Sequence, residues 1–360
     1  MKTPLFVTAT GRNAGKTIVT LGLTHDLSQN YKVGFIKPVG LARVRAGTEA
    51  LDVDAMLIEK TCQLHENIKD MCPVTLSQSD WPEVSPADVD VMLAKVRESY
   101  GRISEGRDVI VVEGTGSAAL GTAMGLPNAR VAAELGCKAL LVAPYGTMIT
   151  NPFDVAALSK EYFKASGVET IGAVINRVPA DLMASYEPYA RKSMERVGIP
   201  LRGLIPESPA LGWFRFLQVS EYLDGEMLCG TSHAEAVIDT VRIGAMTPHR
   251  ALAYFAPKSL IITPGDREDI IVTACACSQR NPGGPSGLVL SGGQRPHDRI
   301  IELLKESGIP TFLASEDSYT VGSKIHDMPL RIQPTDTDKI STVQQLTLDH
   351  LEVEAILGSL

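Results

Sequence analysis

A strand-like run, a short glycine-containing loop and a helical run follow one another at the start of the chain, and this order most restricts its fold. The stretch reads LFVTATGRNAGKTIVTLGL over residues 5–23. In such a loop, backbone N–H groups and the N-terminus of the next helix surround phosphate oxygens. A lysine neutralises charge on the outer phosphates, and a Ser or Thr hydroxyl reaches magnesium. Gly15, Lys16 and Thr17 supply the closing turn and these side chains, so the stretch predicts a phosphate-binding loop.

The loop lacks one glycine of the usual pattern. Thr10 stands where G-x-x-x-x-G-K-[ST] has its first glycine, and Gly11 follows one place later. The alternative is an ordinary strand-to-helix turn that contains Gly-Lys-Thr, but a good strand precedes the loop and a good helix follows it. We therefore expect nucleotide contacts from every loop residue: Thr10, Gly11, Arg12, Asn13, Ala14, Gly15, Lys16 and Thr17.

Short apolar segments alternate with longer amphipathic ones through the first two hundred residues. The strand candidates are rich in Val and Ile without clean alternation, which is typical of strands buried on both faces of a parallel sheet. They cover residues 5–10, 32–39, 108–114, 138–144, 171–178 and 200–207, with helical patterns over 16–30, 86–101 and 151–167. This order predicts an α/β fold with a wound parallel sheet, as in P-loop NTPases.

The pattern changes in SPALGWFRF, residues 208–216, and a second, smaller α/β domain is expected beyond it. Its strand candidates and one helix cover residues 259–265, 287–293, 309–315 and 297–308. We expect domains over 1–211 and 216–335, and a helical tail over 336–360. The tail's apolar residues lie roughly on one helical face, which suits packing on its own domain or on another copy.

Composition excludes several classes of function. The formal net charge of -8, without any basic cluster, argues against a nucleic-acid binder. The chain has no apolar run of the roughly 18 residues that span a bilayer and no room for a signal peptide, so we expect a cytoplasmic protein with no membrane partner. Six cysteines suit a reducing compartment. Cys275 and Cys277 form a lone C-x-C, expected to be buried small residues rather than metal ligands.

Other polar residues come directly after predicted strands. Lys37 ends the second strand, Glu113 the third and Asn176 a later one, and Pro206 and Glu207 end the next. In a parallel sheet, ligands bind beyond the carboxyl ends of the strands. All of these residues are therefore expected at the same edge as the phosphate-binding loop.

The order of these segments resembles the dethiobiotin synthetase family. The segments that carry the resemblance are TGRNAGKT (10–17), FIKPVG (35–40), DVDA (52–55), VVEGTGS (111–117), AVINRV (173–178) and GLIPESPAL (203–211). They are also similar to the ATP-binding half of cobyrinic acid a,c-diamide synthases, and most of all to the synthetase-like N-terminal region of long phosphotransacetylases. In this family Thr is usual at the first loop position, so Thr10 is a family trait.

The resemblance implies ATP and Mg²⁺ as cofactors. Lys16 and Lys37 would contact the phosphates and act in catalysis, and Thr17, Asp54 and Glu113 would hold magnesium. One hydroxyl and two carboxylates are the hard oxygen ligands that magnesium prefers, and lysines beside a phosphoryl group stabilise its charge.

The resemblance also implies a base-binding end of the site. Asn176 would read the adenine edge, and the backbone around Pro206 and Glu207 would close over the base. Alternatives stay open: Asp52 competes with Asp54 for the metal, either aspartate could simply begin the next helix, and Asn176 could be a turn residue. The glycine-rich loop 114–117 matches the acceptor-substrate loop of dethiobiotin synthetases, although the sequence that follows it differs from that of dethiobiotin synthetases.

Residues 216–335 resemble the DRTGG domain of long phosphotransacetylases, which implies a regulatory or ligand-sensing role. AMTPHRALAYF (245–255), SLIITPGDREDIIVTA (259–274), GLVLSGGQRP (287–296) and IPTFLASEDSYTVGSKI (309–325) carry the resemblance. A ligand could contact the polar and glycine residues after its strands: Asp266, Arg267, Asp269, Gly292 and Gly293. Charged residues that open a helix are more often cap and dipole partners, which is what we expect here.

Two functions are compatible with this sequence. We favour a Mg-ATP-binding protein with regulatory output; the alternative is an ATP-dependent ligase that phosphorylates a carboxylate or carbamate. Expected partners are ATP, a small-molecule acceptor or metabolite effector, and a second copy of the chain, because relatives of the first domain are commonly dimers. Cys229 lacks the surroundings of a glutaminase nucleophile, and acetyl transfer is expected only if a separate chain supplies it.

Overall fold

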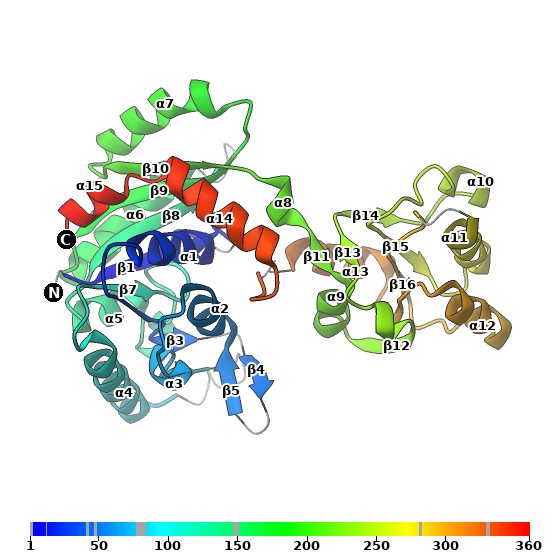
Figure 1. The fold of residues 1–360 in the computed structure, drawn as a ribbon, viewed down its shortest axis with the longest axis horizontal. Coiled ribbons are helices and arrows are strands. Elements are labelled where there is room, and N and C mark those ends of the chain that lie inside the picture. The colour runs from blue at the N-terminus through cyan, green and yellow to red at the C-terminus, as the bar shows by residue number, and fades with distance from the viewer. Residues whose placement is uncertain are drawn as a thin grey trace. The chain divides into compact units, whose positions relative to one another are not determined.

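The computed structural model describes residues 3–11, 13–40, 43–46, 49–76, 84–146, 151–280, 283–328 and 332–360. The chain forms two compact units, labelled by element in Figure 1. Unit 1 comprises Met1–Ser208 together with Ile332–Leu360, and unit 2 is Pro209–Arg331. Unit 2 is therefore an insertion into the sequence of unit 1.

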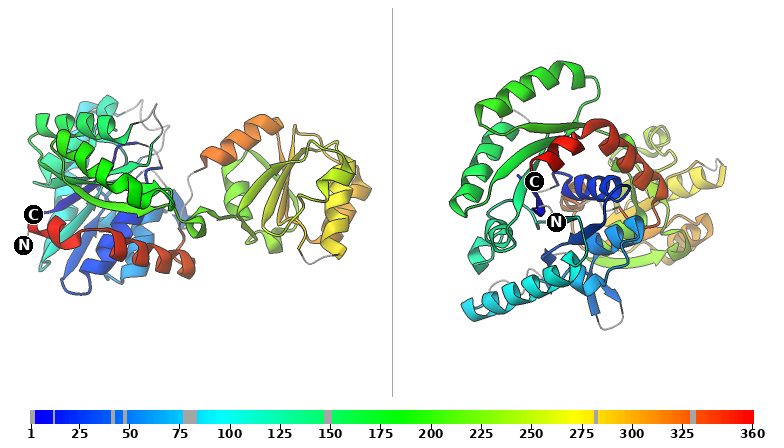
Figure 2. Two further views of the ribbon diagram at one scale, coloured as in Figure 1. Left: turned by 90° about the horizontal axis from the view of Figure 1, so that it is seen from above. Right: turned by 60° about the vertical axis from the view of Figure 1, so that its left-hand side comes forward.

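Unit 1 is built on a six-stranded sheet in the order β10-β9-β8-β1-β7-β2, and every pairing in it is parallel. Its strands are β1 (Leu5–Ala9), β2 (Val33–Ile36), β7 (Val109–Glu113), β8 (Lys138–Pro144), β9 (Thr170–Val178) and β10 (Leu201–Pro206). Helices lie on both sides of the sheet (Figure 2), so the Val- and Ile-rich strands are almost entirely buried. The predicted wound parallel sheet is confirmed.

The helices of unit 1 begin where the sequence supplies caps. Ser85 and Asp88 form a capping box at the start of one helix, and Asn151 caps another, each followed by Pro at the first helical position. The helices are α1 (Lys16–Leu27), α2 (Val53–Cys62), α3 (Ile68–Met71), α4 (Pro86–Ser104), α5 (Asn128–Glu134), α6 (Pro152–Ala165), α7 (Met183–Arg196), α14 (Thr337–His350) and α15 (Val353–Gly358), with a 3-10 turn at Thr122–Met124.

Two small β elements flank the main sheet of unit 1. β3 (Val39–Gly40) pairs in parallel with β6 (Val74–Thr75), and β4 (Arg43–Ala46) forms an antiparallel hairpin with β5 (Glu49–Asp52). The sequence did not suggest either element. β3, β4 and β5 carry the chain from the end of β2 to the start of α2, and β6 follows α3.

The C-terminal tail packs on unit 1. α14 lies along α1, and Leu351 forms an isolated antiparallel bridge with Gly203 of β10. The approach to α1 is close, because a Cβ built on Gly22 would lie 2.1 Å from Thr347 Oγ1. The sequence left open whether the tail packs on its own domain or on another copy; in this chain it packs on unit 1.

Unit 2 contains a five-stranded sheet in the order β12-β17-β16-β15-β14, in which β12 is antiparallel and the rest are parallel. Its strands are β12 (Gly225–Cys229), β14 (Thr240–Ile243), β15 (Ser259–Pro264), β16 (Gly287–Ser291) and β17 (Thr311–Ala314). The other elements are α8 (Pro209–Gly212), the pair β11 (Phe214–Arg215) and β13 (Val237–Ile238), α9 (Phe216–Tyr222), a 3-10 turn at Thr231–His233, α10 (Pro248–Ala251), α11 (Glu268–Arg280), α12 (Asp298–Ser307) and α13 (Ser318–Asp327).

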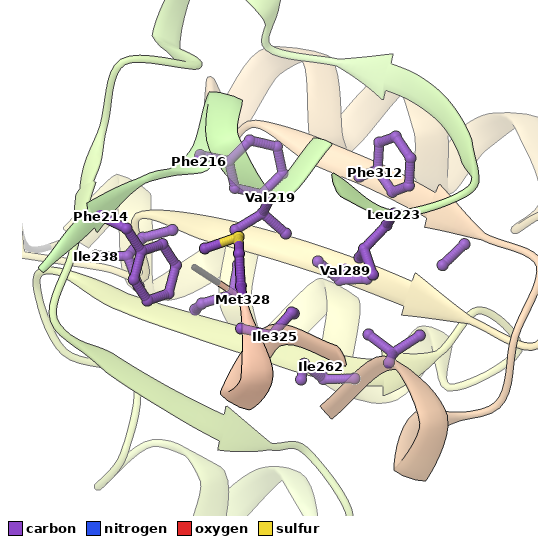
Figure 3. Packing of buried hydrophobic residues seen from close by; sticks show 13 residues of the cluster. Phe214, Phe216, Val219, Leu223, Ile238, Ile262, Val289, Phe312, Ile325 and Met328 are labelled. Atoms are coloured by element: carbon purple, nitrogen blue, oxygen red, sulfur yellow. The ribbon is translucent and has the colours of Figure 1, made fainter. Parts of the chain in front are cut away.

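The sheet of unit 2 has a separate hydrophobic cluster on each face. Phe216 and Val219 of α9 and Ile325 of α13 pack over Val289 on one face (Figure 3). On the other face α10, α11 and α12 contribute a second cluster, which includes Cys275. This is the smaller α/β domain that the sequence predicted. In both units, among the residues that are described, no helix has the length and apolar character needed to cross a bilayer.

Candidate functional site

The loop between β1 and α1 is fixed by backbone hydrogen bonds to two neighbouring segments. The N–H of Thr10 donates to the Val142 carbonyl at 2.9 Å, and the N–H of Ala9 donates to the Gly116 carbonyl at 2.9 Å. Asn13 and Gly15 have positive φ values of 53° and 84°, so the loop turns back on itself before the helix. No side chain among the described residues caps the N-terminus of α1, and the N–H groups of Ile18 and Val19 donate to the Gly15 carbonyl at 3.1 and 3.2 Å. Arg12 lies outside the described residues.

Asn176 supports this loop from the end of β9. Its side chain is nearly buried, and Nδ2 donates to the Ala14 carbonyl at 3.0 Å while Oδ1 accepts from the backbone N–H of Arg177 at 2.9 Å. A Cβ on Gly15 would lie 1.9 Å from Nδ2. In this structure the side chain expected to read adenine is bonded to the loop before α1.

A buried carboxylate lies directly beneath the helix start. Glu113, at the end of β7, is fully buried, and its Oε1 lies 2.9 Å from Lys16 Nζ. Thr17 Oγ1 donates to the same oxygen at 3.2 Å, and Lys37 Nζ lies 4.0 Å from it. One carboxylate oxygen therefore joins the two lysines and the threonine that the sequence assigned to phosphate and metal.

Lys37 is held by two more carboxylates. Its Nζ lies 3.1 Å from Asp52 Oδ1 and is bonded to Asp54 Oδ2, and its backbone N–H donates to the Met71 carbonyl at 2.7 Å. Burial lowers the pKa of the Lys37 ammonium, but Asp54, Asp52 and Glu113 outweigh it and leave the pKa above its usual value. The surrounding carboxylates therefore favour the protonated form of Lys37.

The cluster holds two cations and three carboxylates: Lys16, Lys37, Asp52, Asp54 and Glu113. Its formal charge is therefore -1 when all five are ionised. Asp52 Oδ2 and Glu113 Oε2 are buried without a hydrogen-bond partner among the described residues, and each such atom costs about 1–3 kcal/mol. Burial also raises the pKa of Asp52, against the effect of Lys37. The unsatisfied Glu113 oxygen, on the carboxylate that also accepts from the Thr17 hydroxyl, suits a hard divalent cation such as magnesium.

Pro206 and Glu207 lie elsewhere on the same edge of the sheet. Pro206 is in register with Val178, and the N–H of Glu207 donates to the Val178 carbonyl at 2.8 Å. They therefore lie beside Asn176, whereas two strands, β9 and β8, separate β10 from β1 and the loop. The site residues form a row along the edge, with the charged cluster at one end.

The sequence analysis missed Asn128, which organises the glycine-rich loop after Glu113. Asn128 Oδ1 accepts from the Thr115 N–H at 3.1 Å and the Thr115 hydroxyl at 3.2 Å, and Nδ2 donates to the Ser117 carbonyl at 2.7 Å. It is nearly buried at the start of α5. Its only sequence signal is a position directly after Pro127, where a helix opens.

The candidate ligand residues of unit 2 mostly serve its own loops. Arg267 pairs with Asp269 and donates to the Met246 carbonyl at 2.9 Å. The N–H groups of Gly292 and Gly293 donate to the carbonyls of Glu316, just after β17, and Ala314, at the end of β17. Burial raises the pKa of the Cys229 thiol, which is opposite to the activation that a nucleophile needs.

Comparison with known proteins gives two family matches. The model of the AAA domain matches residues 3–215, and that of the DRTGG domain matches residues 218–328. The phosphate acetyltransferase of Nitratidesulfovibrio vulgaris is 28% identical over an alignment of 371 residues, which covers 100% of this chain and 52% of the relative. That of Pseudomonas putida is 25% identical and covers 96% of this chain and 50% of the relative. The chain thus spans about half the length of the curated relatives it matches.

Solved structures give weaker similarities. The MinC:MinD cell division protein complex of Aquifex aeolicus matches with a TM-score of 0.38 and 14% identity, over 58% of this chain and 83% of that chain. The CBS and DRTGG domains of a Clostridium perfringens pyrophosphatase, complexed with diadenosine tetraphosphate, match with a TM-score of 0.28 and 14% identity, over 50% of this chain and 86% of that chain. The family and sequence matches confirm the predicted resemblance to phosphotransacetylases and to the DRTGG domain.

Proposed function

Because the chain belongs to the AAA domain family through residues 3–215, we propose that unit 1 binds ATP with magnesium and that this binding has a regulatory output. In this proposal Lys16 and Lys37 contact phosphates, and Thr17, Asp54 and Glu113 hold the metal. ATP and magnesium together carry about two negative charges, so they need both the lysines and the carboxylates of the cluster.

One observation carries the nucleotide assignment: Glu113 Oε1 lies within 3.2 Å of both Lys16 Nζ and Thr17 Oγ1, while its other oxygen is buried and unpartnered. A buried carboxylate whose only purpose was to neutralise Lys16 would gain by bonding both oxygens. A cation at the orphaned oxygen accounts for its isolation. It would also release Lys16 toward the negative charge of the phosphates.

The regulatory output rests on how unit 1 is connected to unit 2. The chain leaves unit 1 after β10, whose end carries Pro206, and returns to it just before α14. α14 packs along α1, which begins at the phosphate-binding loop. A change in α1 on nucleotide binding would therefore act on α14, the first helix of unit 1 after residues 209–331 in the sequence.

Calorimetric titration of the purified chain with Mg-ATP tests the binding. We expect Lys16→Ala to weaken it about tenfold or more, since it removes a charge-assisted phosphate contact. Glu113→Gln should remove most of the gain in affinity that magnesium provides. Lys164→Ala, at a side chain that is 74% exposed on α6, is the matched control and should bind like the parent chain. Equal affinity of Lys16→Ala and the parent chain would contradict a nucleotide site here.

Two measurements test the regulatory part. Hydrogen exchange should show altered protection in α14 and in unit 2 when Mg-ATP is added, and Lys16→Ala should suppress the change. Phosphate release should stay low when carboxylates and amines are supplied. Strong acceptor-dependent ADP formation would instead identify a ligase.

A further inference from the structure

We propose that Asp52 is the fixed counter-ion that positions Lys37, and that Asp54 is the exchangeable one that turns to the metal. This inference rests on the proposed function, because it assigns Lys37 to a phosphate and Asp54 to magnesium. It adds a positioning residue, Asp52, that makes no contact with nucleotide or metal itself.

Asp52 is immobilised on one side by the start of α2. Its Oδ1 accepts the backbone N–H groups of Asp54 at 2.9 Å and Ala55 at 3.1 Å, and the same oxygen lies 3.1 Å from Lys37 Nζ. Three donors on one oxygen hold the carboxylate to a single orientation. The hairpin β4–β5 ends at this residue and brings it there.

The other side of the carboxylate is closed by Gly40. A Cβ built on Gly40 would lie 2.5 Å from Asp52 Oδ2 and 2.7 Å from Cys72 Sγ. Gly40 itself is fixed by its pairing with Thr75 in the β3–β6 ladder. The absence of a side chain at Gly40 thus leaves room for Oδ2, and the bonds to Oδ1 hold the Asp52 carboxylate in this orientation.

Capping the N-terminus of α2 does not by itself require the negative charge of Asp52. Ser or Asn caps a helix N-terminus about as well as Asp, and a buried carboxylate carries a desolvation cost that a neutral cap avoids. The Lys37 ammonium, whose side chain is 5% exposed, is the group within 3.1 Å that gains from the charge. The negative charge of Asp52 therefore serves Lys37 rather than the helix.

Asp54 differs from Asp52 in exposure. Both bond to Lys37, but the Asp54 side chain is 20% exposed and that of Asp52 is fully buried. When Asp54 directs an oxygen to a metal ion, its ion pair with Lys37 weakens. Asp52 then keeps the buried ammonium compensated and in place, aimed at the same edge of the sheet as Lys16.

Matched aspartate-to-asparagine variants two residues apart test the assignment. Asp52→Asn keeps the cap acceptor and removes the charge, and Asp54→Asn is its control. ATP affinity is measured with magnesium and again in EDTA. We expect Asp52→Asn to weaken ATP about tenfold or more under both conditions, because Lys37 contacts phosphate in both. Asp54→Asn should weaken ATP with magnesium and leave the affinity in EDTA within about twofold of the parent chain, since Lys37 keeps Asp52 as its charged counter-ion.

A second measurement separates positioning from simple stabilisation. Urea unfolding of the nucleotide-free chain is compared for Asp52→Asn in the parent background and in a Lys37→Met background. A smaller cost of Asp52→Asn in the Lys37→Met background supports the counter-ion role. An equal cost in both backgrounds means that Asp52 is only a cap, and an ATP loss confined to magnesium means that it belongs to the metal site; either result overturns the inference.

Failure of the proposed function has a different signature. If the parent chain binds no ATP under either condition, the nucleotide assignment is wrong and Lys37 has no phosphate to contact. The unfolding comparison still reports whether Asp52 and Lys37 are coupled. If Asp52 and Lys37 are coupled but the chain binds no ATP, the ion pair is supported and its role in phosphate binding is contradicted.

Discussion

Asn176 and Gly15 are in such close contact that no side chain fits between the end of β9 and the start of α1. A Cβ on Gly15 would lie 1.9 Å from Asn176 Nδ2, and Gly15 has a φ of 84°. The contact joins two segments 161 residues apart in sequence, as 176 minus 15 gives. This contact holds the start of α1 close to the end of β9.

Replacing Gly15 should therefore disturb the loop in two ways. Gly15→Ala combines a left-handed backbone with a collision against Asn176, so we expect ATP affinity to fall at least about tenfold and the free energy of unfolding to drop by about 1–3 kcal/mol. Titration and urea unfolding measure both effects. Gly101→Ala is the control, because this helical glycine has nothing within 4 Å of the added Cβ, and it should stabilise the chain by up to about 1 kcal/mol.

Because of the contact between α1 and α14, replacing a second glycine by alanine should destabilise the chain, whereas the same change inside a helix normally stabilises it. Gly22 lies inside α1, where alanine normally gains about 1 kcal/mol in helix propensity. Here the Thr347 side chain occupies the space, so Gly22→Ala should lower the free energy of unfolding by about 1–3 kcal/mol. In urea unfolding, Thr347→Ala should recover part of that loss in the double variant. Stabilisation by Gly22→Ala would mean that α14 does not pack here.

Unit 2 should lose stability when its own core is opened. Phe216 is fully buried, and a Cβ on Gly287 would lie 2.2 Å from its ring. Phe216→Ala should cost about 3–5 kcal/mol, measured by the fluorescence of Trp213 in a Trp81→Phe background. Tyr319→Ala, at a side chain that is 80% exposed, should change stability by less than about 0.5 kcal/mol. ATP affinity should remain unchanged in both variants if unit 1 folds independently.

Alkaline pH should destabilise unit 1 partly through Cys62. Burial, and then the charge of Glu59, raise the pKa of this thiol from 9.0 to about 12. The folded state therefore keeps a proton that the unfolded chain loses above pH 9.0, so stability is full below that pH and falls through the window up to about 12. The contribution is about 1.4 kcal/mol per pH unit. Cys62→Ala should show a shallower decline in unfolding free energy across this window, and an unchanged slope would contradict a raised pKa for this partly buried thiol.

Much of the fold follows from the sequence because its strongest signals are local. The buried strands β7 and β8 read as continuous Val-, Leu- and Ile-rich runs, and the caps at Ser85 and Asn151 mark helix starts. A position after a strand was enough to expect Lys16, Lys37 and Glu113 at one edge of the sheet. Parallel strands impose that placement whatever their order.

The remaining features depend on distances between segments that are far apart in the chain. Asp52 could not be separated from Asp54 by sequence, because the difference lies in burial against Gly40 and in the path of the β4–β5 hairpin. Asn128 has the sequence signature of an ordinary helix start, and its bonds to Thr115 and Ser117 are visible only in three dimensions. From the sequence, the apolar face of α14 suited packing on its own domain or on another copy. Its contact with α1 depends on the three-dimensional fold.

The return of the chain to α1 also has a consequence for its synthesis. Gly22 leaves the ribosome early, whereas Thr347, which covers it, emerges only after the whole of residues 209–331. Until then the outer face of α1 has no helix over it, and at the usual rate of about 5–20 residues per second this lasts many seconds. All residues of the inserted unit, including the paired strands β12 and β17 near its two ends, are synthesised before α14, so unit 2 can complete its fold before unit 1 although its sequence comes second.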